Sequence, residues 1–155
     1  MHHFDDYQLF TDSTAFYPQD LGLPYCTLGL LGESGEYAEK IYKLIELRKA
    51  TLHKYEEIGP FEELKEILRQ AAELGRRAEI LKKSLRKGEK KIPPVVVFSA
   101  DERDELIGEL GDTQHYVARN ARHLKVELSQ VAYSNVKKLT DRQKRGVLEG
   151  EGDKR

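Results

Sequence analysis

The chain has very little cysteine, little net charge and no long apolar run. Its 155 residues include one cysteine, Cys26, which excludes an internal disulfide and indicates a reducing compartment. A formal net charge of -1 gives no general attraction to nucleic acid or acidic membranes. No apolar run approaches the roughly 20 residues that a membrane-spanning helix needs, and the first residues do not resemble a secretory signal. These absences favour a cytoplasmic protein without a membrane span or a stable nucleic-acid partner.

The chain is instead rich in charged residues that alternate with apolar ones at helical spacing. Charged residues make up 34% and hydrophobic residues 39%, a balance typical of a globular protein whose long helices have charged outer faces. Because strand signals are nearly absent, we expect an all-α bundle of about five helices in a single domain, 1–155. The expected helices cover residues 4–17, 25–57, 61–87, about 99–124 and about 127–139.

Prolines and glycines predict where these helices stop. Pro18 is expected to stop the first helix, Gly22 and Pro24 to keep the stretch before the second helix irregular, and Gly59-Pro60 to end the second helix. Residues 92–98, with two prolines, predict an extended linker or a short edge strand. Ser99 or Asp101 is expected to cap the fourth helix, and residues 141–155 form a glycine-rich charged tail.

Three glycines lie close together in the first third of the second predicted helix. Each of Gly29, Gly32 and Gly35 costs roughly 1 kcal/mol relative to alanine inside a helix. Their spacing therefore predicts the close approach of another backbone or of a ligand, or an irregular start to the helix.

Two acidic pairs have the spacing of metal ligands. Glu33 and Glu36 are three residues apart, as are Glu109 and Asp112, so each pair shares a helix face. If the two helices pack side by side, four carboxylates converge, a ligand set that suits Mg²⁺, with Mn²⁺ as a substitute. The alternative is that the pairs form solvated helix faces, as most such pairs do in a chain with 27 acidic residues.

The apolar stripes favour the second pair over the first. Glu109 and Asp112 lie on the flank of their stripe, where a bundle seam is expected, whereas Glu33 and Glu36 lie largely away from theirs. A metal site at the first pair therefore requires a second covering surface, such as another subunit.

Three segments resemble the motifs of MazG-like nucleotide pyrophosphohydrolases, in the order that this family has them. Residues 28–41 resemble the first motif, a glutamate cluster EExxE, with Gly32 in place of its first glutamate. Residues 105–116 resemble the second motif, an ExxD, and residues 135–155 resemble the C-terminal segment of phage-type and bacterial members. Residues 50–98, an inserted helix and a proline-rich linker, have no counterpart and make the gap between the motifs unusually long.

The resemblance implies the all-α NTP pyrophosphatase fold and a Mg²⁺-dependent reaction. Members hydrolyse a nucleoside triphosphate to a monophosphate and pyrophosphate, and they form homodimers or homotetramers. The implied metal ligands are Glu33, Glu36, Glu109 and Asp112, with Glu36 as the general base and Glu39 as the second candidate for that role. Since one glutamate of the motif is absent, a non-catalytic helical module that binds nucleotides or a protein partner remains the alternative.

Cationic and aromatic side chains near the motifs are candidates for binding the nucleotide. Lysine and arginine bind phosphate, arginine with a planar pair of donors. Ordinary surface charge is the alternative for each cation taken alone, and Tyr116 equally fits a core position. The candidates are Lys40, Lys43, Lys138, Arg142 and Arg145 for the phosphates, Asn135 for the base or sugar, and Tyr116 for stacking on the base.

Overall fold

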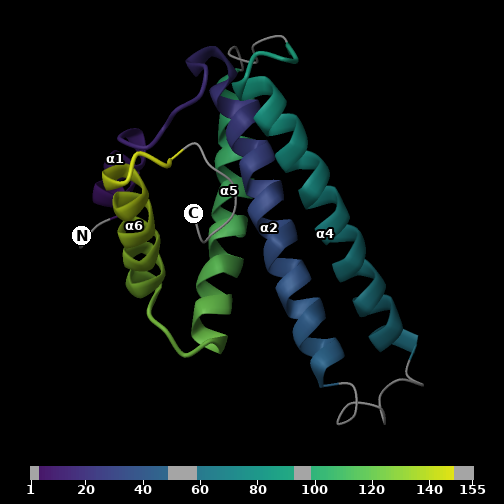
Figure 1. Cartoon of the computed structure of the whole chain (residues 1–155). Helices are drawn as coiled ribbons and strands as arrows, with labels where there is room; N and C mark the ends of the chain where they lie inside the picture. Colours follow the sequence, from purple (N-terminus) through teal and green to yellow (C-terminus); the bar gives the residue numbers. More distant parts are fainter. Residues whose placement is uncertain (1–3, 49–58, 93–98, 149–155) are drawn as a thin grey trace. The chain divides into compact units, whose positions relative to one another are not determined.

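The described part of the chain is entirely helical. The structure, a computed structural model, describes residues 4–48, 59–92 and 99–148, and no strand occurs among them. This confirms the all-α prediction, and no helix in these ranges is long and apolar enough to cross a membrane. Figure 1 shows α1 (Phe4–Asp12), α2 (Gly22–Leu47), α4 (Gly59–Arg86), α5 (Ala100–His123) and α6 (Leu128–Lys144). A short 3-10 turn, η1 (Gln19–Leu21), directly precedes α2.

The chain divides into two compact units. One unit comprises residues 17–96 and contains η1, α2 and α4, while the other comprises residues 1–16 and 97–155 and contains α1, α5 and α6. The first acidic pair belongs to the former unit and the second pair to the latter. The predicted edge strand at residues 92–98 and the end of the predicted second helix lie mostly outside the described residues.

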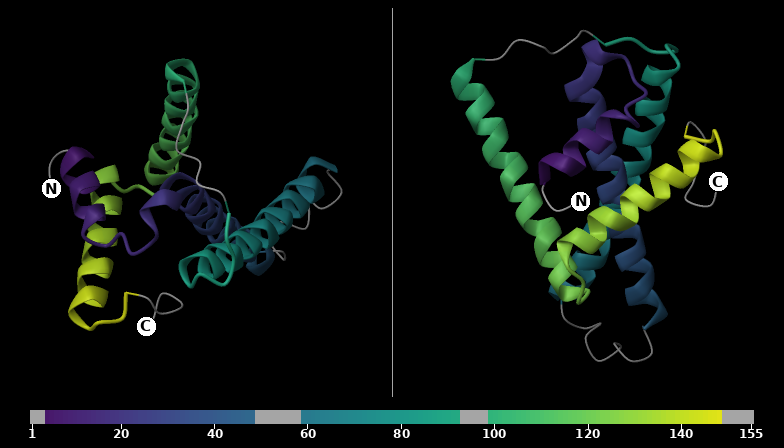
Figure 2. Two further views of the ribbon diagram at one scale, coloured as in Figure 1. Left: turned by 90° about the horizontal axis from the view of Figure 1, so that it is seen from above. Right: turned by 90° about the vertical axis from the view of Figure 1, so that its left-hand side faces the viewer.

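In the unit of residues 17–96, α2 and α4 form an antiparallel pair of long helices that lie side by side in both views (Figures 1 and 2). Small side chains dominate the contact, because the buried residues include several alanines and glycines. Small residues at an interface let two helix backbones approach closely. The buried apolar residues of this unit are Leu21, Ala38, Ala72, Ala78 and Leu85.

The closest point between α2 and α4 is a contact of two glycines. A Cβ added to Gly35 would lie 2.6 Å from the Cα of Gly75 and 2.8 Å from the carbonyl oxygen of Ala71. Both neighbours are backbone atoms, so no side-chain rotation can relieve the overlap. The predicted close approach of another backbone is thus confirmed at Gly35, and the partner is Gly75.

In the other unit, α1 and α5 both contact α6. The Tyr7 hydroxyl donates a 3.0 Å hydrogen bond to the side-chain oxygen of Asn135, which joins α1 to α6. Figure 2 shows α5 and α6 meeting at the turn that joins them and then diverging. Burial is correspondingly small, since Ala121 and Arg142 are the buried residues of the helices in this unit.

A capping box starts α5, and its N-cap is Ser99, one of the two caps that the sequence predicted. The Ser99 hydroxyl accepts a hydrogen bond from the Glu102 backbone N–H, and the Glu102 carboxylate accepts one from the Ser99 backbone N–H. This second bond holds the pKa of Glu102 below its ordinary value. The stabilisation from Glu102 is therefore present at neutral pH and is lost as the pH falls through that lowered pKa.

Replacing Ser99 by alanine is expected to destabilise α5 by about 1 kcal/mol, because the first turn loses its side-chain acceptor. Circular dichroism at increasing temperature measures the effect as lost helicity and an earlier transition. Ser134→Ala, an exposed serine inside α6, is the matched control and should cause no loss. Equal melting curves for the two variants would contradict the capping role.

Several helix ends differ from those predicted. Gly22 and Pro24 lie in the first turn of α2, and Gly59-Pro60 begins α4 instead of ending the helix before it. Proline is tolerated there because the first N–H groups of a helix have no intrahelical acceptor. At its C-terminus, α6 continues to Lys144, so the first residues of the predicted tail are helical.

The first predicted helix is shorter than expected, because α1 ends at Asp12 rather than near residue 17. The hydroxyls of Ser13 and Thr14 donate hydrogen bonds to the carbonyl oxygens of Phe10 and Thr11. Such local bonds compete with helix propagation and favour a turn.

Candidate metal and nucleotide site

One exposed face of α2 carries carboxylates and ammonium groups together. At about 100° per residue, four predicted site residues fall within about 80° of one another around the helix. All four are exposed, and a Mg²⁺ ion or a phosphate chain can reach them from solvent. These residues are Glu33, Glu36, Lys40 and Lys43.

Glu39 lies on the edge of the α2–α4 contact and is engaged by cations. Its carboxylate oxygen is 2.9 Å from the Lys43 ammonium and 3.8 Å from the Arg76 guanidinium of α4. The hydrogen bond from Lys43 holds the pKa of Glu39 below its ordinary value, with further lowering by Arg76 and Lys40. A lowered pKa makes a carboxylate a weaker base, so the geometry favours Glu36 over Glu39 as the proton acceptor.

On α5, the second acidic pair shares an exposed face with the candidate stacking residue. Glu109, Asp112 and Tyr116 fall within about 60° of one another around the helix. Tyr116 is 68% exposed, which favours a surface role over the core position that the sequence equally allowed.

Within its own unit, the apolar stripe beside this pair is not buried. Leu106 is 47% exposed, Leu110 64% and Val117 45%. The amphipathic pattern correctly predicts a helix, but α5 is covered in its own unit only near Ala121. A stripe of this kind normally contacts another surface.

The donor chemistry of both pairs fits a hard divalent cation. Each pair offers two carboxylates at i and i+3, and Mg²⁺ is usually bound by one or two protein carboxylates together with water and substrate phosphates. No group of three or more His, Cys, Asp or Glu side chains is close enough to hold a metal ion in residues 4–48, 59–92 and 99–148. Within its own unit, each of the two helices α2 and α5 therefore offers one pair of carboxylates.

The predicted nucleotide-binding residues of the C-terminal motif share one face of α6. Arg142 is 6% exposed, Asn135 bonds to Tyr7, and Arg145 is 2.8 Å from the Asp141 carboxylate. Burial also raises the pKa of Tyr7. Asn135 thus joins α6 to α1, and the Arg142 side chain is buried. The face comprises Asn135, Lys138 and Arg142, and Arg145 follows as the C-cap residue of α6.

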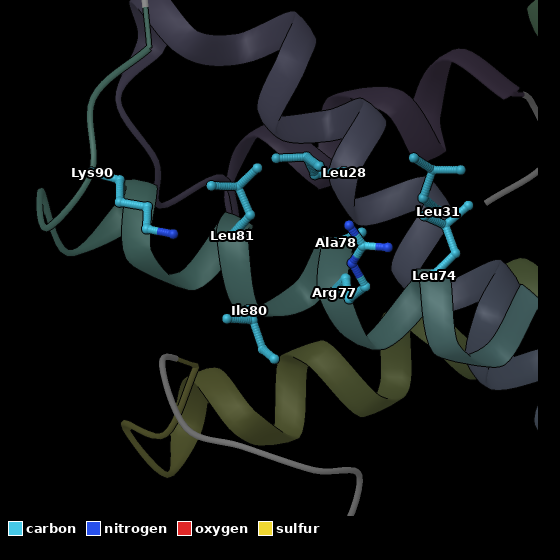
Figure 3. Close-up of a pocket in the computed structure, with 8 residues that line it drawn as sticks. All are labelled: Leu28, Leu31, Leu74, Arg77, Ala78, Ile80, Leu81 and Lys90. Carbon is cyan, nitrogen blue, oxygen red and sulfur yellow. The ribbon is translucent and has the colours of Figure 1, made fainter. Parts of the chain in front are cut away.

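An open, mostly apolar pocket of about 400 Å³ lies on the α2–α4 pair (Figure 3). Leu31 on its wall and Glu33 lie about 160° apart around α2, so this pocket is not the carboxylate face. Its lining offers no carboxylate ligands for a cation, and Arg77 and Lys90 are the two cationic side chains among its lining residues. Its lining residues are Leu28, Leu31, Leu74, Arg77, Ala78, Ile80, Leu81 and Lys90.

The structure adds residues that the sequence patterns did not indicate. Glu79 and Lys82 of α4 form an ion pair that lies against Gly32 and Gly29 of the first motif. The Lys82 ammonium lies over the Tyr25 ring, 6.0 Å from the ring centre. The Tyr25 ring also stacks on the Tyr17 ring, with 4.6 Å between the two ring centres. The glycines of the motif were the available signal, since each leaves room for a side chain from elsewhere.

Comparison with known proteins gives one informative relative. No known family profile matches the chain, and no solved structure matches it. The Gene 37 protein of Mycobacterium phage L5 aligns with it over 159 positions at 33% identity, covering 99% of both chains. The chain belongs to the Gene 37 protein family. Because the alignment spans nearly all of both chains, α4 aligns with a segment of the relative as well. The long stretch between the two acidic pairs is accordingly shared within the Gene 37 family.

Proposed function

We propose that this chain is a Mg²⁺-dependent nucleoside triphosphate pyrophosphohydrolase of the MazG-like type. The observation that carries the proposal is the exposed face of α2, where Glu33 and Glu36 lie beside Lys40 and Lys43. Carboxylates for a cation and ammonium groups for phosphate, within one or two helical turns, are the parts that phosphoanhydride hydrolysis needs. The resemblance of three segments to the MazG-like motifs supports the same reaction.

The proposed reaction cleaves the bond between the α-phosphorus and the oxygen that bridges to the β-phosphate. The carboxylate pair of α2 and that of α5 would each hold Mg²⁺, which would neutralise phosphate oxygens and lower the pKa of a bound water. Glu36 accepts the proton of that water as its oxygen bonds to the α-phosphorus, while Lys40 and Lys43 stabilise the departing pyrophosphate. The products are a nucleoside monophosphate and pyrophosphate, and the cytoplasm supplies the substrate.

A homodimer or homotetramer is part of the proposal. The exposed Leu106, Leu110 and Val117 of α5 support it, because an apolar stripe beside an acidic pair favours contact with a second helix. The same exposed stripe favours the second candidate, a non-catalytic module that binds a protein partner. The two candidates differ in whether the chain consumes nucleotide.

Incubation of the full chain with each NTP and dNTP separately tests the activity. We expect Mg²⁺-dependent release of pyrophosphate and nucleoside monophosphate from at least one of them, and loss of release when EDTA removes the metal. Melting curves with and without Mg²⁺ provide a readout that does not depend on turnover, since a bound cation stabilises the folded state. No release from any nucleotide, together with unchanged melting curves, would refute the enzyme and favour the binding module.

A further inference from the structure

Glu79 of α4 occupies the space that a side chain at position 32 of α2 would take. A Cβ added to Gly32 would lie 2.7 Å from the Cγ and 2.9 Å from the Cδ of Glu79, and it would also overlap one carboxylate oxygen. Gly32 is buried, whereas Glu33 and Glu36 on the same helix are exposed. The missing side chain therefore makes room for a carboxylate that comes from the neighbouring helix.

This places the Glu79 carboxylate beside the proposed site. Positions 32 and 36 are one helical turn apart, and Cβ atoms at such positions are about 5–6 Å apart. A carboxylate lying against Gly32 is thus one turn from the base of the Glu36 side chain. A water molecule can bridge two polar groups that do not touch each other directly.

Lys82 fixes the Glu79 side chain. The two form an ion pair on α4, and their side chains are 17% and 20% exposed. The Lys82 ammonium would lie 3.6 Å from a Cβ added to Gly29, so the pair rests along the glycine face of α2. An ionised carboxylate accepts several hydrogen bonds through two oxygens, and the bond to Lys82 leaves acceptor capacity for a water.

We propose that Glu79 is a further catalytic residue, which accepts a hydrogen bond from the attacking water and orients it while Glu36 takes the proton. This inference rests on the proposed function. The carboxylate that α2 lacks at Gly32 then comes from α4, a helix that has no counterpart in the MazG-like motifs. The role is to orient water and not to bind the metal.

The test combines Glu79→Gln with two double variants, which remove the side chain at position 79 of α4 and place one at position 32 of α2. Glu79→Gln is expected to lower kcat about 10- to 100-fold with little change in KM, the usual cost of losing an orienting group. The double variant Gly32→Glu/Glu79→Gly should recover most of kcat, because it returns the carboxylate from α2. The double variant Gly32→Gln/Glu79→Gly places a side chain of the same size but without the charge at position 32, and it should not recover kcat. Glu73→Gln removes an exposed glutamate of α4 that pairs with Arg76, and it should leave kcat unchanged.

Two outcomes overturn the inference while leaving the proposed function intact. One is an active chain in which Glu79→Gln keeps the wild-type kcat. The other is equal recovery in the two double variants, which would mean that only packing at position 32 matters. The Mg²⁺-dependent rise in melting temperature should persist in Glu79→Gln, and its loss would show a metal ligand instead of an orienting residue. A wild-type chain that hydrolyses no nucleotide refutes both proposals.

Discussion

Glutamine in place of Glu36 is expected to lower the rate of pyrophosphate release about 10²- to 10⁴-fold, the usual contribution of a general base. The substitution keeps the size of the side chain and its place on the exposed face of α2. It removes the charge that accepts the proton and attracts the cation. The rate is measured at saturating nucleotide and Mg²⁺.

Glu39→Gln and Glu63→Gln are the comparisons for this experiment. Glu39 is held by Lys43 and Arg76, and its lowered pKa makes it the weaker base, so its replacement should reduce the rate only a few-fold. Glu63 is an exposed residue of the first turns of α4, and its replacement should have no effect. Full turnover in Glu36→Gln with a large loss in Glu39→Gln would assign the base to Glu39.

The helices themselves were largely predictable from the chain, because apolar residues at helical spacing and the Ser99 cap are local features. Their ends were less so. Pro24 and Pro60 read as breaks, although each lies in a first turn where no hydrogen-bond donor is required. An amphipathic pattern also shows that one face of a helix packs against another surface, but it does not show which surface that is. Leu110 of α5 accordingly fits a bundle seam by pattern and is 64% exposed in the structure.

In the candidate site, too, the features within one helix were predictable and those that depend on packing between helices were not. The i, i+3 spacing correctly places Glu33 beside Glu36, and Glu109 beside Asp112, on shared helix faces. Glu79 could not be found in this way, since its position against Gly32 depends on how α4 lies along α2. That alignment is set by Gly35 and Gly75, which are 40 residues apart in the chain. Local spacing reports neighbours on one helix and carries no information about the register between two helices.

The close contact between Gly35 of α2 and Gly75 of α4 also predicts a large effect on stability. Gly35→Ala is expected to lower the free energy of unfolding by about 2 kcal/mol, even though alanine is favoured over glycine in a helix by roughly 1 kcal/mol. The new Cβ would lie 2.6 Å from the Cα of Gly75, so α2 and α4 must separate and lose contacts along their length. Equilibrium unfolding in urea, followed by circular dichroism, measures the change.

Gly108→Ala and Gly111→Ala are the matched controls, because a Cβ at either position of α5 meets nothing within 4 Å. Each should raise the stability of its own unit by up to about 1 kcal/mol through helix propensity alone. The sign of the effect therefore separates close packing from propensity, with Gly75→Ala expected to follow Gly35→Ala. A stabilising Gly35→Ala would contradict the contact between α2 and α4, and with it the position of Glu79 beside Gly32. Destabilisation by Gly108→Ala or Gly111→Ala would instead mean that α5 is covered in solution, as the proposed oligomer requires.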